Sequence, residues 1–186
     1  GFPLSSPGRL GCRFFSVAAD VLAPRLIGQR LVRVLDDGTR LSGVIVETEA
    51  YLGVHDRAAH SFGGRRTERN EAMYAGAGTS YVYFTYGMHF CVNVVCGRVG
   101  EPTAVLLRAL VPEEGVERMA VHRGLEAWDP RAVAALCRGP GNLCKALAID
   151  RRLNFIGLTV HPSLWIERIH LRKRRVPAAG LPAGIE

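Results

Sequence analysis

The chain has 186 residues, 24 lysines and arginines, 17 aspartates and glutamates, and a formal net charge of +7 at pH 7. This length fits a single domain of ordinary size. The basic charge suits a polyanionic partner, but charge alone does not distinguish such a partner from a solvated basic surface. The five cysteines are odd in number and form no Cys-x-x-Cys pair, so we expect a reduced intracellular protein. No apolar run is long enough for a membrane span, and no signal peptide is expected.

The first third of the chain predicts a lead-in, one helix and one hairpin. Residues 1–11 are rich in Gly, Pro and Ser and are expected to be a flexible lead-in. Residues 17–27 have the apolar spacing of a helix, although Pro24 obscures where it starts. Residues 30–35 and 40–47 alternate like strands and are joined through Asp36-Asp37-Gly38, which predicts a β-hairpin.

The rest of the chain predicts a long loop, three strands and three helices. Residues 57–78 lack periodicity and are expected to form a functional loop with a short helix at best. Strands are predicted at 80–85 and 88–96, meeting at Tyr86-Gly87, and at 103–109, buried on both faces. Helices are predicted at 113–122, at 130–137 with Asp129 as N-cap, and at 142–149 after Gly139-Pro140-Gly141. Residues 12–186 therefore read as one mixed α/β domain without repeats.

The stretch from Ile45 to Asn93 carries the residues best suited to chemistry. It opens Ile45-Val46-Glu47-Thr48-Glu49-Ala50-Tyr51-Leu52-Gly53 and closes Tyr81-Val82-Tyr83-Phe84-Thr85-Tyr86-Gly87-Met88-His89-Phe90-Cys91-Val92-Asn93. Strand alternation places Tyr81 with Tyr83 on one face, Glu49 with Tyr51, and Asn93 with His89 and Cys91. A carboxylate beside several tyrosines in a basic protein suits acid–base chemistry on a flat aromatic ligand.

These segments closely resemble the alkyladenine (3-methyladenine) DNA glycosylase family over roughly Phe14 to Ile149. The resemblance implies a monofunctional enzyme that flips damaged purines (3-methyladenine, 7-methylguanine, hypoxanthine, ethenoadenine) out of duplex DNA and hydrolyses the N-glycosidic bond with water. We expect a mixed α/β domain with a curved, largely antiparallel sheet, flanking helices and a protruding β-hairpin. No metal and no organic cofactor is expected, and the protein is expected to be a monomer that binds double-stranded DNA.

The resemblance also implies roles for single residues. Glu49 corresponds to the general base that activates water, and Arg108 to the arginine that holds this carboxylate. The stacking walls correspond to Tyr51, His60 and Tyr83, and the positions that discriminate among purines to Asn93 and Leu106. Tyr86 corresponds to the wedge at the hairpin tip. Further DNA contacts are expected from Met88, Arg65, Arg66, Arg69 and Lys145.

Several alternatives stay open from the sequence alone. Glu47 competes with Glu49, since both share a face if the strand extends that far, and only the family register favours Glu49. Strand tyrosines are more often packing residues, His60 fits an ordinary loop, and Asn93 fits a core hydrogen-bonding residue. Arg108 lies in an apolar strand, where its charge requires a carboxylate partner. A damaged-DNA or RNA binder and a free nucleoside hydrolase are the alternative functions.

Three other motifs in the chain are less informative. Cys91, Cys96 and His89 are too few for a zinc site. Residues 139–145 lack the Gly-Lys-Ser/Thr ending of a nucleoside triphosphate loop, although their amides suit a DNA phosphate. The basic run at 172–175 is either a solvated edge or a phosphate contact. The chain also departs from the family at Ala183-Gly184-Ile185-Glu186, where relatives continue into a further strand.

Overall fold

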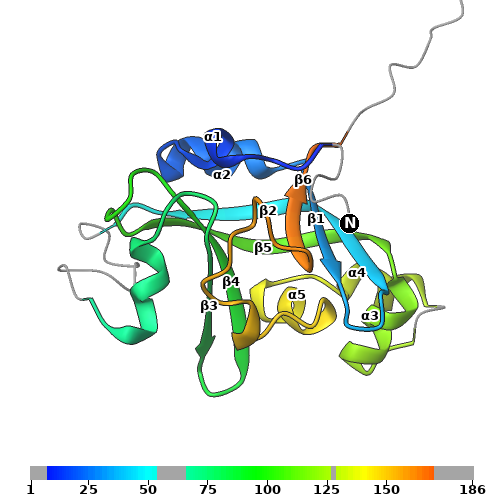
Figure 1. The fold of residues 1–186 in the computed structure, drawn as a ribbon. Helices are drawn as coiled ribbons and strands as arrows, with labels where there is room; N and C mark the ends of the chain where they lie inside the picture. The colour runs from blue at the N-terminus through cyan, green and yellow to red at the C-terminus, as the bar shows by residue number, and fades with distance from the viewer. Residues whose placement is uncertain (1–7, 54–65, 127–128, 170–186) are drawn as a thin grey trace, which may run out of the picture.

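A six-stranded antiparallel sheet, curled into a half-barrel, forms the centre of the protein (Figure 1). The structure is a computed structural model that describes residues 8–53, 66–126 and 129–169. The strands follow the spatial order β3-β4-β5-β2-β1-β6, and every neighbouring pair is antiparallel. The expected mixed α/β fold with a curved antiparallel sheet is confirmed. The strands are β1 (Arg30–Val34), β2 (Arg40–Tyr51), β3 (Ser80–Thr85), β4 (His89–Cys96), β5 (Thr103–Glu114) and β6 (Leu164–Glu167).

Short helices surround this sheet. The α-helices are α1 (Cys12–Phe15), α2 (Ala19–Leu26), α3 (Val116–Arg123), α4 (Pro130–Ala135) and α5 (Pro140–Ala146), with 3-10 helices η2 (Glu68–Tyr74) and η3 (Arg151–Leu153). Pro24 lies inside α2, and the Asp129 side chain caps α4 by accepting from the Arg131 amide over 2.9 Å, as the sequence predicts. Figure 1 shows α1 and α2 on one side of the sheet and α5 on the other.

Two predicted hairpins are confirmed, and one strand is longer than expected. β1 pairs with β2 and β3 pairs with β4, at the places where the apolar alternation indicates them. β2 continues beyond residue 47 to Tyr51 because it keeps pairing with β5, through a bulge between Ile45 and Thr48. This extension brings Glu49 and Tyr51 into the sheet.

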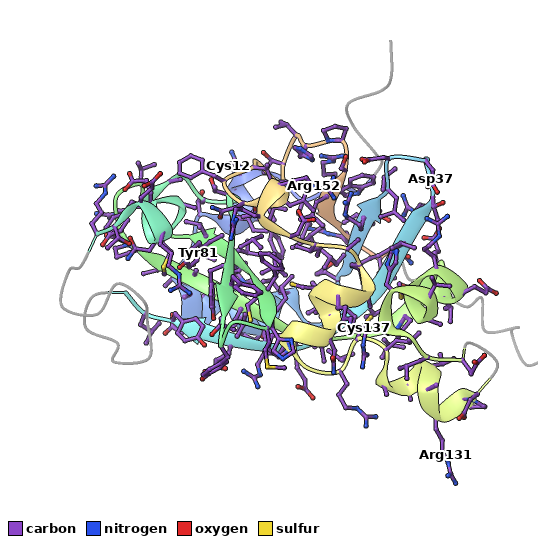
Figure 2. All side chains as sticks on the ribbon, turned by 90° about the horizontal axis from the view of Figure 1, so that it is seen from below. Cys12, Asp37, Tyr81, Arg131, Cys137 and Arg152 are labelled. Atoms are coloured by element: carbon purple, nitrogen blue, oxygen red, sulfur yellow. The ribbon has the colours of Figure 1, made fainter. Side chains whose placement is uncertain are left out.

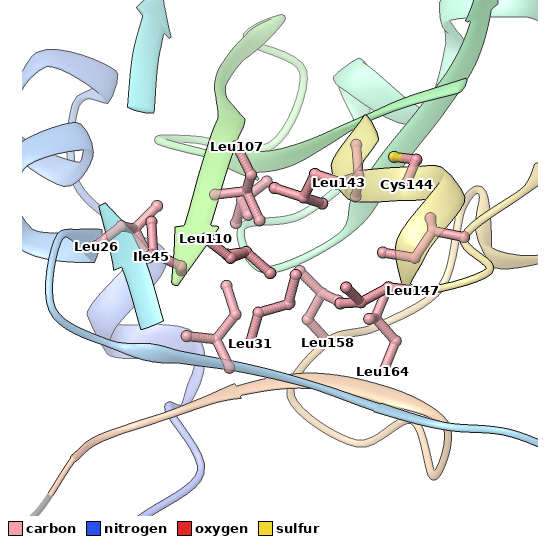
Figure 3. Close-up of a cluster of buried hydrophobic side chains, with 14 of the residues drawn as sticks. Leu26, Leu31, Ile45, Leu107, Leu110, Leu143, Cys144, Leu147, Leu158 and Leu164 are labelled. Atoms are coloured by element: carbon pink, nitrogen blue, oxygen red, sulfur yellow. The ribbon is translucent and has the colours of Figure 1, made fainter. Parts of the chain in front are cut away.

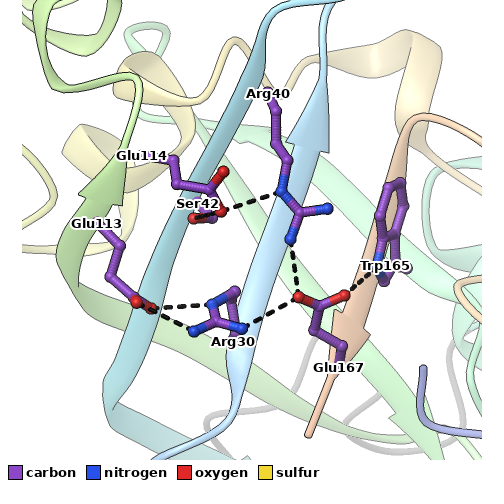
Figure 4. A network of polar contacts seen from close by, with 7 residues as sticks. All are labelled: Arg30, Arg40, Ser42, Glu113, Glu114, Trp165 and Glu167. Carbon is purple, nitrogen blue, oxygen red and sulfur yellow. Dashed lines mark hydrogen bonds and ion pairs between the residues drawn. The ribbon is translucent and has the colours of Figure 1, made fainter. Parts of the chain in front are cut away.

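The helix predicted to begin at Glu113 is wrong at its start, since β5 runs to Glu114 and α3 begins only at Val116. Glu113 accepts hydrogen bonds from Arg30 at 3.0 Å, and Glu114 accepts from Arg40 at 3.0 Å (Figure 4). These long-range pairs hold both glutamates on the strand. Gly115, with a φ of 73°, then turns the chain into α3.

The same polar network fixes β6, a strand that the sequence reading missed. Glu167 is 5% exposed, accepts from Arg40 at 2.8 Å and Arg30 at 3.2 Å, and also accepts from the Trp165 indole N–H at 3.0 Å. Figure 4 shows the two arginines lying between the glutamates of β5 and the one of β6. The helices α1 and η3 were not predicted either. Three predicted helices differ at their ends, since α2 spans 19–26 rather than 17–27, α4 spans 130–135 rather than 130–137, and α5 spans 140–146 rather than 142–149.

Two apolar clusters support the sheet. The larger joins the buried leucines of α2 and α5 to β1, β2 and β5, among them Leu26, Leu107 and Leu143 (Figure 3). The smaller contains Ala72, Met73, Tyr81, Val95 and Ala104, and it packs η2 against β3, β4 and β5. Figure 2 shows Tyr81 among packed side chains, whereas Arg131 projects away from the protein. The smaller cluster therefore anchors the part of the sheet that carries the predicted site residues.

Candidate active site

One row of residues crosses four strands and ends at the predicted catalytic glutamate. Tyr81 on β3 is opposite Asn93 on β4, Asn93 is opposite Leu106 on β5, and Leu106 is opposite Glu49 on β2. Directly paired residues point to the same face of a sheet, and so do residues two positions apart. The row thus places Tyr51, Tyr83 and Arg108 on the same face as well.

Glu49 and Arg108 form an ion pair on this face. The Arg108 Nη1 group donates to the Glu49 Oε2 atom over 2.7 Å. The two side chains are 43% and 40% exposed, so solvent reaches the carboxylate. Glu47, which competed for the same role, is exposed and makes no ion pair in the part of the chain that the structure describes. The carboxylate partner expected for Arg108 is therefore Glu49.

A cleft of about 540 Å³ opens on the Arg108 side of this pair, whereas Glu49 lines a separate hollow that it shares with Glu47 and Arg108. Five of the predicted residues line it: Tyr51, Tyr83, Tyr86, Leu106 and Arg108. Its lining also includes Thr85, His89, Cys91 and residues 139–142 at the start of α5. Gly141 lets α5 come close, because a Cβ there would lie 2.8 Å from the His89 ring. The contribution of His89 and Cys91 was missed as a site, although strand alternation already placed both beside Asn93.

The cleft presents neutral aromatic surfaces. The Tyr81 and Tyr83 rings lie 5.2 Å apart between centroids. Burial raises the pKa of Tyr81 to about 12. Burial, with a smaller contribution from the hydrogen bond to Cys91, raises the pKa of Tyr83 well above its usual value. Both phenols stay protonated at neutral pH, so Tyr83 offers an uncharged face for stacking on a base.

Burial also raises the pKa of the Cys91 thiol. A thiol with a raised pKa stays protonated at neutral pH and is a poor nucleophile. Cys91 therefore acts here as a small wall residue that contacts the Tyr83 hydroxyl.

Asn93 is buried in the sheet beside the cleft. Its side chain is 2% exposed, and its Nδ2 group donates to the Tyr81 backbone oxygen over 3.2 Å. It directly faces Leu106, which does line the cleft. Its part in selecting purines stays a prediction.

The β3–β4 hairpin ends in two exposed apolar side chains. Tyr86 is 91% exposed and Met88 is 72% exposed. Tyr86 and Gly87 both have positive φ values, 52° and 65°, and the Met88 amide donates to the Thr85 oxygen over 3.1 Å, which describes a tight two-residue turn. The hairpin protrudes from the rest of the fold (Figure 1). A large exposed tyrosine at a protruding tip is available for contact with a partner.

Three of the basic residues predicted to contact DNA, Arg66, Arg69 and Lys145, lie in the described part of the chain. Arg66 forms an ion pair with Glu71, and its guanidinium lies 4.4 Å from the centroid of the Tyr74 ring. Arg69 donates to the Phe84 backbone oxygen at the edge of β3. Lys145 is exposed on α5, one turn after Gly141 in the cleft wall. His60, Arg65 and the run at 172–175 lie outside the described residues.

Two further observations concern residues 8–53, 66–126 and 129–169. Within these ranges, no three His, Cys, Asp or Glu side chains gather closely enough to hold a metal ion. None of the helices found there is both long and apolar enough to cross a bilayer.

Comparison with known proteins identifies the family of the chain. The profile of the family described as methylpurine-DNA glycosylase matches residues 13–182. The DNA-3-methyladenine glycosylase of Mus musculus is 47% identical over 175 residues, which cover 89% of this chain and 50% of that protein. The human DNA-3-methyladenine glycosylase is also 47% identical, over 167 residues that cover 86% of this chain and 54% of that protein.

A bacterial relative matches over more of its own length. A candidate 3-methyladenine DNA glycosylase of Desulfitobacterium hafniense is 48% identical over 149 residues, covering 78% of this chain and 73% of that protein. The chain thus spans about half the length of the two mammalian relatives but most of the bacterial one.

Proposed function

Because the chain belongs to the methylpurine-DNA glycosylase family, we propose that it removes damaged purines from DNA by hydrolysing the N-glycosidic bond. The observation that carries the proposal is the Glu49–Arg108 ion pair beside a tyrosine-lined cleft. A protein that only binds damaged DNA has no need of a solvent-accessible carboxylate next to the base pocket. The pair therefore favours catalysis over recognition alone.

Glu49 supplies the base for the reaction. The bond between the sugar C1′ and the purine nitrogen breaks, its electron pair leaves with the purine, and positive charge develops on the sugar. Water adds to C1′ and loses a proton to the Glu49 carboxylate. Arg108 orients that carboxylate through the 2.7 Å hydrogen bond. Carboxylate and water suffice for this step, so the proposal invokes neither a metal nor an organic cofactor.

The aromatic walls hold the base. Tyr51 and Tyr83 line the cleft, and the neutral ring of Tyr83 suits stacking on a flipped purine. Because the base is inside the duplex before flipping, something has to replace it in the stack. Tyr86 at the hairpin tip fills that space, and Met88 next to it contacts the minor groove. His60 is assigned as the third wall on the resemblance alone.

The proposed substrates are 3-methyladenine, 7-methylguanine, hypoxanthine and ethenoadenine in double-stranded DNA. The N3- and N7-alkylated purines are cationic and leave readily, whereas the neutral bases need protonation or hydrogen bonding in the cleft. An amine nucleophile would be required for strand cleavage, and Lys145, on α5, is not among the residues that line the cleft. The protein is proposed to act as a monofunctional monomer on intracellular DNA, with Arg65, Arg66, Arg69 and Lys145 contacting phosphates.

One experiment separates this function from its two alternatives. The purified chain is incubated with a duplex that carries hypoxanthine and, separately, with free deoxyinosine, and released hypoxanthine is measured. Release from the duplex alone supports the glycosylase. Release from the free nucleoside at a comparable rate would establish a nucleoside hydrolase, and binding to the duplex without any release would establish a recognition protein.

A further inference from the structure

A second cleft, of about 690 Å³, lies on the other side of the β3–β4 hairpin. It follows the outer edge of β3, between η2 and η3. The residues that matter to its chemistry are Arg69, Phe84, Phe90, Arg151, Asn154 and, at the hairpin tip, Tyr86. No role in the glycosylase reaction requires this cleft.

The two clefts share the hairpin as a common wall. Tyr83 and Tyr86 line both of them, whereas Arg108, which bonds to Glu49, lines only the cleft of the candidate active site. A tyrosine that enters a base stack from the minor groove stands between the two DNA strands. If one strand delivers the damaged nucleotide to the first cleft, the second cleft faces the other strand.

The second cleft carries groups that suit a sugar–phosphate backbone. Arg69 is held in place by its bond to the Phe84 oxygen, and Arg151 is exposed and makes no ion pair within the described residues. Phe84 and Phe90 provide an apolar floor, with ring centroids 5.0 Å apart. Asn154 fixes η3 against β3, because its Oδ1 atom accepts from the Val82 amide over 2.9 Å. Arg151 therefore has a defined place beside the hairpin.

We propose that this cleft binds the DNA strand opposite the damaged nucleotide, with Arg69 and Arg151 on its phosphates and Phe84 and Phe90 against its deoxyriboses. The inference rests on the proposed function and extends it to the complementary strand. Charge complementarity supports it, since two arginines and one acidic residue, Glu68, line the cleft of a protein with a net charge of +7.

Neighbouring arginines provide a matched pair of variants. Arg151→Ala removes the proposed phosphate contact. Arg152→Ala removes an arginine of the same short helix that already pairs with Asp150 at 3.1 Å. Fluorescence anisotropy measures the affinity of each variant for a duplex with a reduced abasic site and for the same abasic strand alone.

We expect Arg151→Ala to weaken duplex binding about 3–10-fold and to lower the slope of log affinity against log salt by about one. Its affinity for the single strand should equal that of the parent, and Arg152→Ala should match the parent on both. Glu68→Gln should tighten duplex binding only, because it removes the acidic group of the cleft. Equal loss on duplex and single strand in Arg151→Ala would overturn the proposal.

Phosphate neutralisation then identifies the strand. Uncharged methylphosphonates are placed one at a time in the complementary strand. At one or two positions they should weaken the binding of the parent protein to the duplex, and at those positions they should leave the binding of Arg151→Ala unchanged. If Arg151→Ala were instead insensitive to methylphosphonates in the damaged strand, the assignment of the cleft to the complementary strand would be refuted. A parent that binds duplex DNA but excises no base would refute the proposed function, whereas the strand assignment would still be decided by these affinities.

Discussion

Arg108 donates to Glu49 over 2.7 Å although the two residues are 59 positions apart in the chain. The sheet produces this contact: Glu49 is opposite Leu106 in the pairing of β2 with β5, and Arg108 follows Leu106 on the same face. The charge of Arg108, which lies in the apolar stretch of β5 from Ala104 to Val111, is thereby paired with the one carboxylate that the proposed chemistry needs. The position of Arg108 is thus explained by the position of Glu49.

We predict that Glu49→Gln keeps its affinity for damaged duplex DNA and loses excision. The amide still hydrogen-bonds but cannot accept a proton from water, so the single-turnover rate should fall about 10²–10⁴-fold or more. Glu47→Gln is the control and should stay close to the parent, because Arg108 bonds to Glu49 and not to Glu47, although the two glutamates line the same hollow. Comparable rates in Glu49→Gln and the parent, together with a large loss in Glu47→Gln, would assign the base to Glu47.

Tyr86→Ala should reduce flipping, because nothing then fills the gap in the base stack. Less unstacking energy is needed where the damaged base is already mispaired, so the loss should be smallest there. The measurement is the single-turnover rate on paired and mispaired hypoxanthine duplexes. Met88→Ala serves as a second exposed tip variant, and its ratio of the two rates should change less. An equal loss on both duplexes would make Tyr86 a structural turn residue.

Local sequence patterns predict where the strands of this fold lie better than they predict where each strand ends. The β3–β4 hairpin follows from the alternation at 80–96, and the N-cap Asp129 follows from its place before Pro130. The end of β5 does not, because Glu113 and Glu114 have good helical propensity and are kept extended by Arg30 and Arg40, which are distant in sequence. β6 is short and depends on the same network.

The sequence predicts which site residues of a single strand share a face. It does not predict which residues from separate elements come together in the site. Alternation placed Glu49 with Tyr51 and Asn93 with Cys91, and the cross-strand pairing agrees with both. The approach of residues 139–142 to His89 could not be read from either segment, since it depends on how α5 packs on β4. The second cleft likewise appears only when η2 and η3 flank the edge of β3.

Binding should weaken steeply with salt. An arginine-rich contact surface releases counterions from the phosphates, so log affinity should fall linearly with log salt, with a slope of about −0.9 for each phosphate neutralised. Anisotropy titrations of a damaged duplex between low and physiological salt give the slope. A flat dependence would contradict a DNA substrate and would favour a small riboside.

Glu167 should contribute more to stability than an exposed ion-paired carboxylate does. It is 5% exposed and accepts from Arg30, Arg40 and Trp165, so Glu167→Gln should lower the free energy of unfolding by about 1–3 kcal/mol. Arg30 and Arg40 keep their other partners, Glu113 and Glu114, which limits the loss. Urea denaturation measures it.

The matched control is Asp37→Asn, which breaks the exposed pair between Asp37 and Arg118. Solvent screens that pair, so its loss should be smaller than the loss in Glu167→Gln. Equal losses in the two variants would show that the polar network joining β1, β2, β5 and β6 holds β6 to the sheet no more strongly than an exposed ion pair would.

Asn93 provides the sharpest prediction about substrate choice. Adenine-type lesions and hypoxanthine carry no amino group at C2, whereas guanine does. Asn93 is 2% exposed, is held by its bond to the Tyr81 oxygen, and faces Leu106 in the cleft wall. If its amide lies against the C2 edge of the purine, it excludes that amino group by crowding and by leaving a buried donor unpaired. Such burial costs about 1–3 kcal/mol, enough to set a preference.

Asn93→Ser should therefore raise excision of guanine-derived bases relative to hypoxanthine, even if both rates fall. The shorter side chain opens space beside Leu106 and gives up the bond to the Tyr81 oxygen, so some loss of stability is expected as well. The ratio of single-turnover rates on matched duplexes separates the two effects, because a general loss of stability lowers both rates alike. An unchanged ratio would make Asn93 a structural residue of β4 and would move purine selection to Leu106 or to the tyrosine walls.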